Sequence, residues 1–434
     1  MFLILVFFFL LLTLFIKVRI KDHMSLWVVM SFVCYWFISL CLSTFNPYTL
    51  YPVSERAYYL LILNVASFVL GFSCITIEPK TICYNELEDR INQRIKKLIH
   101  SKLFIFFVLL CTIVCLRIYS MYAMYIHMGE GRVDAILEVA NKGGGMFLTI
   151  HQFICSPLFY CVCVLFSWMI FNYRNWKVIL LLLLYIISYS IIGGGRTAFL
   201  VVFIGMFFIR YVGKEIFNRR NITISKNIYV LIAILFVISY FTMSWISAVR
   251  DGYDIFSWDT MSYGCDKLNK EFITYSLLPF RLFDYALEHN YLEKIGMQYG
   301  LSTLDGLNRY AYIILKKVGI NISLVSAETT QYFQNTWIWV GKDIRANYAY
   351  TNALYHYLDF AEFGVFIFPF LFGVLFRTII KKFQKNVSLA GFFLLFYLYY
   401  VLVHSVFTWH IQKMYALGFV IITVFFLYKK RNIA

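Results

Sequence analysis

Long apolar runs separated by short basic segments are the feature that most restricts how this chain folds. Runs of about 18 or more apolar residues are typical of transmembrane helices. Hydrophobic residues make up 61% of the 434 positions and charged residues 14%, whereas a soluble globular domain has about 45–50% apolar and about 25% charged residues. The pattern predicts an all-α polytopic membrane protein with about 11 transmembrane helices and one long extramembrane loop between spans eight and nine.

The predicted spans divide the chain into three segments. Spans one to eight form a membrane domain over 1–246, a long loop covers 247–351, and spans nine to eleven form a membrane domain over 352–434. The segment 86–99 has apolar residues at helical spacing and is expected to lie on the membrane surface. The spans themselves are expected at 2–16, 24–42, 57–77, 103–127, 146–171, 178–192, 197–211, 228–246, 352–376, 387–407 and 411–428.

The placement of basic residues predicts the orientation and excludes one class of partner. The formal net charge is +16, which by itself would fit a nucleic-acid-binding protein. Most Lys and Arg residues, however, follow spans one, three, five, seven, nine and eleven, which is the pattern of cytoplasmic loops. We therefore expect no nucleic-acid partner, a cytoplasmic C-terminus, and an N-terminus and a long loop on the outer side. The first apolar run lacks a preceding basic segment and a small-residue cleavage site, so it is interpreted as a retained span.

The sequence lacks the common motifs of metal and cofactor sites. The ten cysteines lie mostly inside apolar runs, where they act as small buried hydrophobic residues. The long loop contains Cys265 alone, so no disulfide within the loop is expected, and no CxxC or Cys/His spacing occurs. Neither a Walker-type Gly-Lys-Ser/Thr sequence nor HExxH is present. The expectation is a protein without cofactor or metal.

The loop 247–351 is the only long segment that is not continuously apolar. It carries 11 of the chain's 23 acidic residues and is rich in Tyr, Trp and Asn. These residue types bind sugars and other polar ligands. We expect this loop to be a lid over a membrane-embedded site.

Four arginines are candidate ligands for an anion. Arg196 follows Gly193, Gly194 and Gly195 at the predicted outer surface, and glycines there let a ligand approach the backbone closely. Arg117 lies in the outer half of span four, Arg250 directly after span eight, and Arg281 in the loop. The planar guanidinium suits phosphate or carboxylate. The alternatives are snorkelling to lipid headgroups for Arg196 and Arg117 and, for Arg250, a local ion pair with Asp251.

The beginning of span nine carries the candidate proton acceptors. At 3.6 residues per turn, Asn352, His356 and Asp359 share one face, and Glu362 lies beside it. Ionisable groups at the head of a span usually face a polar cavity, and a carboxylate there can accept a proton from a sugar hydroxyl. The alternative is a hydrogen-bonded helix start whose carboxylates pair with loop arginines. His404 and His410 flank the turn between the last two spans and are expected to line the cavity rather than to catalyse.

These residues resemble a known family. The Gly-Gly-Gly-Arg-Thr-Ala turn at 193–198 is similar to the Gly-Gly-x-Arg turn of bacterial oligosaccharide repeat-unit polymerases, the Wzy-type O-antigen polymerases. Arg250, the late outer loop and the segment 352–373, with its Tyr-x-Asp-Phe sequence, Pro369 and Gly373, fit the same family. One departure is Asp-Phe-Ala-Glu-Phe-Gly in place of the family's Asp-Phe-Gly, so that either Asp359 or Glu362 occupies the family's carboxylate position.

The resemblance implies an activity, a location and partners. Such metal-independent glycosyltransferases move a growing glycan from undecaprenyl diphosphate to a new lipid-linked repeat unit, on the periplasmic face of the bacterial inner membrane. Arg196 and Arg250 would neutralise the leaving diphosphate, and Asp359, Glu362 or His356 would deprotonate the acceptor hydroxyl. Membrane lipids, a chain-length regulator and a flippase are the further partners that the resemblance implies.

Three alternatives stay open at this point. An O-antigen ligase or another lipid-linked glycosyltransferase has similar chemistry with a different acceptor. A flippase or secondary transporter would instead place polar residues in the middle of the membrane and would have short loops. A structural subunit of an envelope complex is the third alternative.

Overall fold

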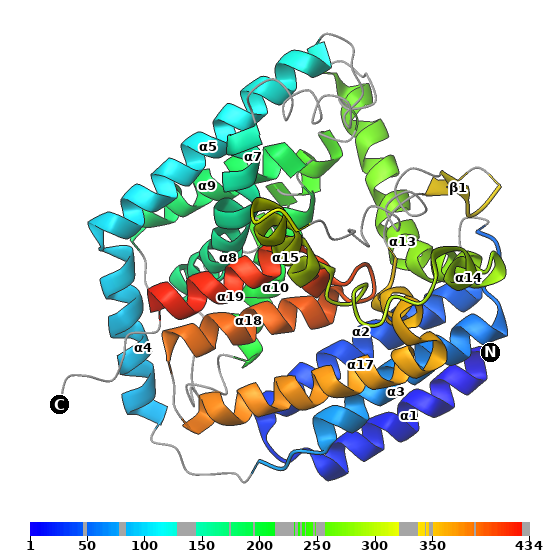
Figure 1. Cartoon of the computed structure of the whole chain (residues 1–434). Helices are drawn as coiled ribbons and strands as arrows, with labels where there is room; N and C mark the ends of the chain where they lie inside the picture. The colour runs from blue at the N-terminus through cyan, green and yellow to red at the C-terminus, as the bar shows by residue number, and fades with distance from the viewer. Residues whose placement is uncertain are drawn as a thin grey trace. The chain divides into compact units, whose positions relative to one another are not determined.

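The computed structural model of the chain consists almost entirely of helices (Figure 1). The described strands have two residues each: β1 (Ile338–Trp339) and β2 (Arg345–Ala346) are antiparallel, with Ile338 opposite Ala346. The predicted all-α class therefore holds for the described part of the chain. The structure describes residues 1–46, 50–77, 84–127, 145–172, 175–193, 196–212, 257–320, 337–342, 344–346, 350–385 and 388–427, with short pieces between 230 and 248.

The helices coincide with the predicted spans except the eighth, 228–246, which lies for the most part outside the described residues. Their bounds differ from the predicted ones by a few residues, except at the end of span nine. They are α1 (Phe2–Arg19), α2 (His23–Phe45), α3 (Glu55–Ser73), α5 (Lys102–His127), α7 (Gly145–Ile150) with η3 (His151–Cys155) and α8 (Ser156–Asn172), α9 (Trp176–Gly193), α10 (Arg196–Phe207) with η4 (Phe208–Val212), α17 (Asn352–Lys385), α18 (Leu389–His404) and α19 (Met414–Leu427).

Six helical stretches among the described residues are long and apolar enough to cross a membrane. Three shorter apolar helices accompany them, at Trp176–Ile192, Leu200–Arg210 and Leu389–His404. This set of helices is compatible with a multi-pass membrane protein. The count of eleven spans and the outer location of the long loop stay predictions.

Helices also occur where the sequence predicted no span. The amphipathic segment 86–99 lies within α4 (Tyr84–Ile99), so its predicted helix is confirmed, whereas its location on a membrane surface stays a prediction. The sequence pattern located no elements inside the long loop. There the structure has α13 (Trp258–Glu288), α14 (Tyr291–Ile295) and α15 (Asp305–Lys317).

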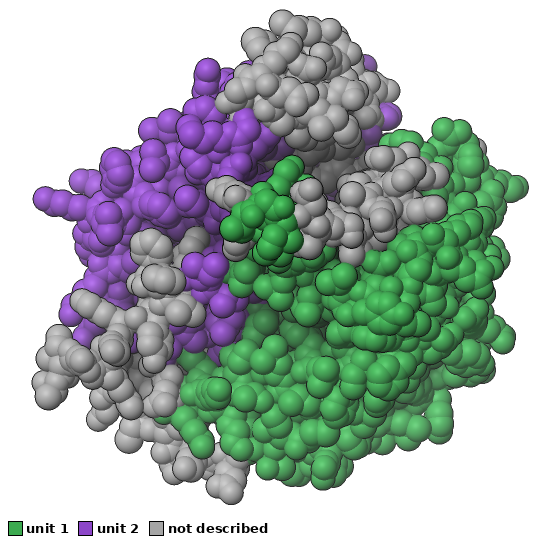
Figure 2. All heavy atoms as spheres, viewed as in Figure 1, with its two compact units in different colours: residues 1–82, 269–386, 398–417 green, residues 83–268, 387–397, 418–434 purple. Residues whose placement is uncertain are grey.

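The contacts within the chain define two compact units, which Figure 2 shows in different colours. The first comprises Met1–Ile82, Asn269–Asn386 and Leu398–Leu417, and the second comprises Cys83–Leu268, Val387–Tyr397 and Gly418–Ala434. Most of the long loop thus belongs to the first unit, together with the first three predicted spans and the ninth.

Glycines permit a close approach of α3 and α17 in the first unit. A Cβ atom on Gly373 would clash with the carbonyl oxygen of Phe68, and one on Gly71 would clash with the carbonyl oxygen of Phe370. The two backbones therefore touch where side chains are absent, as small residues allow in packed membrane helices. This contact holds the part of α17 around Gly373 against the last turns of α3.

A buried ion pair ties α17 to the start of α2. Arg377 Nη1 lies 2.7 Å from Asp22 Oδ2, and the two side chains are 2% and 9% exposed. Asp22 also caps α2 by accepting a hydrogen bond from the Ser25 N–H group at 2.9 Å. Removal of one partner would leave a buried charge unpaired, which is strongly destabilising.

In the second unit, α8 packs against α9 and α10, and α5 packs against α9. The Tyr185 hydroxyl on α9 donates to the Cys155 carbonyl at 2.6 Å. That carbonyl lies at the end of the π-helical segment η3, and Ser156 Oγ donates to the His151 carbonyl in the same segment at 2.9 Å. Side-chain donors thus stabilise the irregular backbone of this predicted span.

Candidate functional site

The helix α17 is interrupted near its start. Phe360 (φ −148°, ψ 34°) and Ala361 (φ 51°, ψ −138°) have non-helical backbone angles. The predicted ninth span is therefore a short helix up to Asp359 followed by a longer helix from Glu362. A Cβ atom on Gly364 would clash with the His356 carbonyl oxygen, so a glycine is needed where the two helical pieces meet.

Backbone groups of a neighbouring turn replace the helical hydrogen bonds lost at this interruption. The carbonyls of Leu358 and Asp359 would bond to N–H groups four residues later in a continuous helix. They instead accept from the N–H groups of Gln298, at 2.9 Å, and Tyr299, at 3.2 Å. The turn between α14 and α15 is thereby docked onto the interruption.

The side chain of Asp359 also binds this turn. Its Oδ1 accepts from the Ser302 N–H group at 2.9 Å, its Oδ2 accepts from the Thr303 N–H group at 2.8 Å, and the residue is fully buried. Both carboxylate oxygens are therefore engaged with backbone donors. The contacts give this candidate base a positioning role in the structure as it stands.

His356 and Asn352 lie in a buried polar cluster behind the interruption. His356 Nδ1 is 3.0 Å from Thr303 Oγ1, its Nε2 is 3.4 Å from Asn352 Nδ2, and both residues are buried. Asn352 also exchanges hydrogen bonds with Asn64 of α3 at 3.2 and 3.3 Å. A small cavity beside Asn64, Asn352 and Ser405 has a volume of about 10 Å³. This is about the space that one buried water molecule needs.

Glu362, the first residue after the interruption, has an exposed carboxylate and a cationic partner. Arg56 Nη2, in the first turn of α3, donates to Glu362 Oε1 at 2.8 Å and to the Tyr357 hydroxyl at 3.2 Å. The side chains of Arg56 and Glu362 are 57% and 52% exposed. A guanidinium, a carboxylate and a phenol thus meet at the surface where α17 is interrupted.

Sequence reasoning missed Arg56. The residue lies directly before the third predicted span, where a basic residue is commonly interpreted as an interfacial anchor. Ser54, two positions earlier, is an N-cap residue and is a local signal that Arg56 lies in the first turn of a helix. Its proximity to Glu362 is a long-range contact across 306 positions, which no local pattern reveals.

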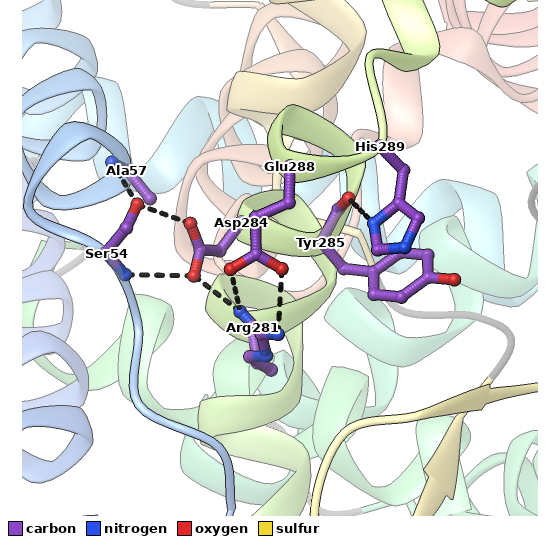
Figure 3. A network of polar contacts seen from close by, with 7 residues as sticks. All are labelled: Ser54, Ala57, Arg281, Asp284, Tyr285, Glu288 and His289. Atoms are coloured by element: carbon purple, nitrogen blue, oxygen red, sulfur yellow. Dashed lines mark hydrogen bonds and ion pairs between the residues drawn. The ribbon is translucent and has the colours of Figure 1, made fainter.

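Arg281 lies in a network of ion pairs on α13 (Figure 3). Its Nη1 donates to Asp284 Oδ2 at 2.6 Å and to Glu288 Oε1 at 3.1 Å, and its Nη2 donates to Glu288 Oε2 at 2.9 Å. Burial acts to lower the pKa of Arg281, but Glu288 and Asp284 favour the charged form and raise it above its ordinary value. The anion partners of this candidate residue are thus carboxylates of the same helix.

The remaining candidates lie elsewhere. Gly193 is the last residue of α9 and Arg196 the first of α10, which agrees with the predicted glycine turn between two spans. The side chain of Arg196 falls outside the described residues, as do Gly194, Gly195 and Arg250. Arg117 is exposed on α5. All of these belong to the second unit.

His404 and His410 contact one another in the first unit. His410 Nε2 lies 3.0 Å from His404 Nδ1 and 3.0 Å from the Tyr400 hydroxyl, and His410 Nδ1 contacts the Tyr415 hydroxyl. Both histidines are buried. Among the residues that the structure describes, no group of three His, Cys, Asp or Glu side chains is arranged to hold a metal ion.

The fold and site together define an all-α protein with membrane-length helices and, at an interrupted helix, an exposed Arg56–Glu362 pair beside the buried Tyr357. Comparison with protein-family models, with curated proteins and with solved structures gives no match.

Proposed function

We propose that the chain is a polymerase of undecaprenyl-diphosphate-linked oligosaccharide repeat units for a surface polysaccharide such as O-antigen. It transfers the growing glycan to a new lipid-linked unit on the periplasmic face of the bacterial inner membrane. The observation that supports this most is the Arg56–Glu362–Tyr357 cluster at the start of a membrane-length helix. It combines the two groups that the transfer needs, a cation for a diphosphate and a base for a hydroxyl.

Glu362 is the base in this proposal. It is the one of the three candidate acceptors that is exposed, whereas Asp359 and His356 are fully buried. The Glu362 carboxylate takes the proton of the acceptor hydroxyl, and the hydroxyl oxygen forms a bond to the anomeric carbon of the growing glycan. The bond from that carbon to the diphosphate oxygen breaks, and the electron pair leaves with undecaprenyl diphosphate.

Arg56 neutralises the charge that develops on the leaving diphosphate. In the structure its guanidinium is engaged by Glu362 at 2.8 Å. A diphosphate carries more negative charge than a carboxylate and accepts bidentate hydrogen bonds from arginine. Arrival of the lipid-linked donor therefore draws Arg56 toward the diphosphate and frees Glu362 to accept a proton.

The resemblance in sequence assigns diphosphate binding to Arg196 and Arg250 as well. Arg196→Lys tests this separately, since it keeps the charge but removes the planar fork. Strong loss of chain extension at normal membrane abundance would support the assignment. Full activity in both Arg196→Lys and Arg196→Ala would show that the residue is only an interfacial anchor.

The experiment that tests the function uses the purified protein in liposomes with lipid-linked repeat units as the sole glycan substrate. A polymerase converts them into a ladder of longer lipid-linked chains. A ligase leaves them unextended until lipid A-core is added, and a flippase moves them across the bilayer without lengthening. Either of the last two results overturns the proposal.

A further inference from the structure

The start of α3 is held by a residue far away in the sequence. The Ser54 N–H group donates to Asp284 Oδ2 at 2.9 Å, and the Ser54 hydroxyl donates to Asp284 Oδ1 (Figure 3). Asp284 is fully buried on α13. A single buried carboxylate thus binds both hydrogen-bond donors of Ser54.

Ser54 transmits this restraint into the helix. It is the N-cap residue of α3, and its Oγ accepts from the Ala57 N–H group at 3.3 Å. The same hydroxyl therefore donates to Asp284 and caps the first helical turn. Arg56 belongs to that turn, two residues after Ser54, so the position of its Cα atom follows from the Ser54–Asp284 contact.

Asp284 is itself held in place by Arg281. The Arg281 guanidinium bonds to Asp284 through Nη1 and to both oxygens of Glu288, and it is 8% exposed. Charged hydrogen bonds of this kind are short and directional. The buried arginine therefore fixes the direction in which the Asp284 carboxylate faces the start of α3.

Arg56 needs such a restraint because its own side chain is exposed. With 57% exposure, the guanidinium has many rotamers available, and an exposed ion pair contributes little to its placement. Displacement of a catalytic group by about 1 Å can lower a rate about a hundredfold. The backbone position of Arg56 is thus the quantity that the buried network can set.

We propose that Asp284 is a positioning residue that, through Ser54, sets the backbone position from which Arg56 reaches the diphosphate beside Glu362. The inference rests on the proposed function of the Arg56–Glu362 pair. It also gives Arg281 a role in orienting Asp284 in place of the direct diphosphate contact expected from the sequence.

A double-mutant cycle in the liposome assay tests this. We expect Asp284→Asn to lower kcat/KM for the lipid-linked repeat unit by roughly tenfold to a hundredfold, since the amide presents a donor where two acceptors are needed. In an Arg56→Ala background, Asp284→Asn should then lower kcat/KM by less than about twofold, because the group that it positions is gone. Ser54→Ala should behave like Asp284→Asn, and Ser54→Thr, which keeps the hydroxyl, should restore most of the rate.

Asp305→Asn is the matched control. Asp305 is another buried aspartate of the first unit, paired with Arg309 at 2.8 Å within α15, and its replacement should leave kcat/KM close to the wild-type value. Equal losses from Asp284→Asn in the presence and absence of Arg56 would overturn the inference while leaving the proposed function intact. Full activity of Arg56→Ala together with Glu362→Gln would overturn the proposed function of the pair itself.

Discussion

The guanidinium of Arg56 lies 2.8 Å from the carboxylate of Glu362, although the two residues are 306 positions apart in the chain. Both side chains are more than half exposed. Exposed ion pairs contribute about 0–1 kcal/mol to stability. Loss of this contact between α3 and the interruption of α17 should therefore change the free energy of unfolding little, whereas the proposed function expects a large loss of chain extension.

Glu362→Gln should separate these two roles. The amide keeps the size of the side chain but does not accept a proton, so chain extension should fall by about 10²–10⁴-fold, the usual range for loss of a general base. The unfolding temperature in detergent should stay close to that of the wild type. Glu55→Gln, at the adjacent exposed acid before Arg56, is the control and should extend chains normally. A full ladder from Glu362→Gln would exclude this carboxylate as the base.

Asp359→Asn should chiefly lower stability. In the wild type, the carboxylate accepts from the backbone N–H groups of Ser302 and Thr303. In the variant, one of these two N–H groups would face the amide NH₂ group, which is a donor. A buried donor left unsatisfied costs about 1–3 kcal/mol, so membrane abundance and the unfolding temperature should both decrease. If the variant is as stable as the wild type and yet extends no chains, Asp359 and not Glu362 is the base.

Ala361→Gly should stabilise the protein. Ala361 has φ 51° and ψ −138°, a region that is essentially restricted to glycine. Relief of that strain should exceed the entropy that glycine adds to the unfolded chain and should raise the free energy of unfolding by about 1 kcal/mol. Ala353→Gly, in the regular part of the same helix, should lower it by about 1 kcal/mol. Equal shifts for the two variants, measured by thermal unfolding in the same detergent, would contradict the interrupted geometry.

Stability should fall as the pH is lowered below neutrality. Burial lowers the pKa of His410 well below the ordinary value of 6.5, and the neighbouring His404 adds to this effect. The folded state therefore keeps His410 neutral while the unfolded state binds a proton below about pH 6.5. The stability from this residue is present above that pH and is lost, by at most about 1.4 kcal/mol per pH unit, as the pH falls.

His410→Gln should flatten this pH dependence. Glutamine can still hydrogen-bond to the surrounding hydroxyls but binds no proton between pH 7.5 and 5. Unfolding temperatures at pH 7.5, 6.5 and 5.5 measure the slope, with His289→Gln, at an exposed histidine directly after α13, as the control. A slope identical to that of the wild type would show that His410 does not carry the effect.

Reporter fusions test the predicted orientation. A reporter that is active only in the cytoplasm should be active when it is fused after Arg431 and silent when it is fused after Gly319, two residues beyond the end of α15. The expectation rests on the excess of Lys and Arg in the segments that follow the odd-numbered spans. Activity of the fusion after Gly319 would place the Arg56–Glu362 pair on the cytoplasmic side and would exclude the periplasmic reaction.

The sequence by itself determined the helical class and the positions of most of the helices. Apolar runs such as those of α1 and α5 are long enough to span a bilayer, and this length is a local property that a hydropathy pattern reports. The amphipathic helix α4 could be located for the same reason, because the spacing of its apolar residues repeats along one short segment. The acidic and aromatic segment before α17 also stood out in composition.

Only the tertiary structure decided which polar residues meet. Helical periodicity placed Asp359 and Glu362 on neighbouring faces, but the interruption at Phe360 and Ala361 separates them into one buried and one exposed carboxylate. That interruption depends on hydrogen bonds from the distant turn at Gln298 and Tyr299. Arg56 and Asp284 likewise acquire their partners across more than 200 positions. Such contacts depend on how elements pack against one another, and a local pattern of residue types carries no information about that packing.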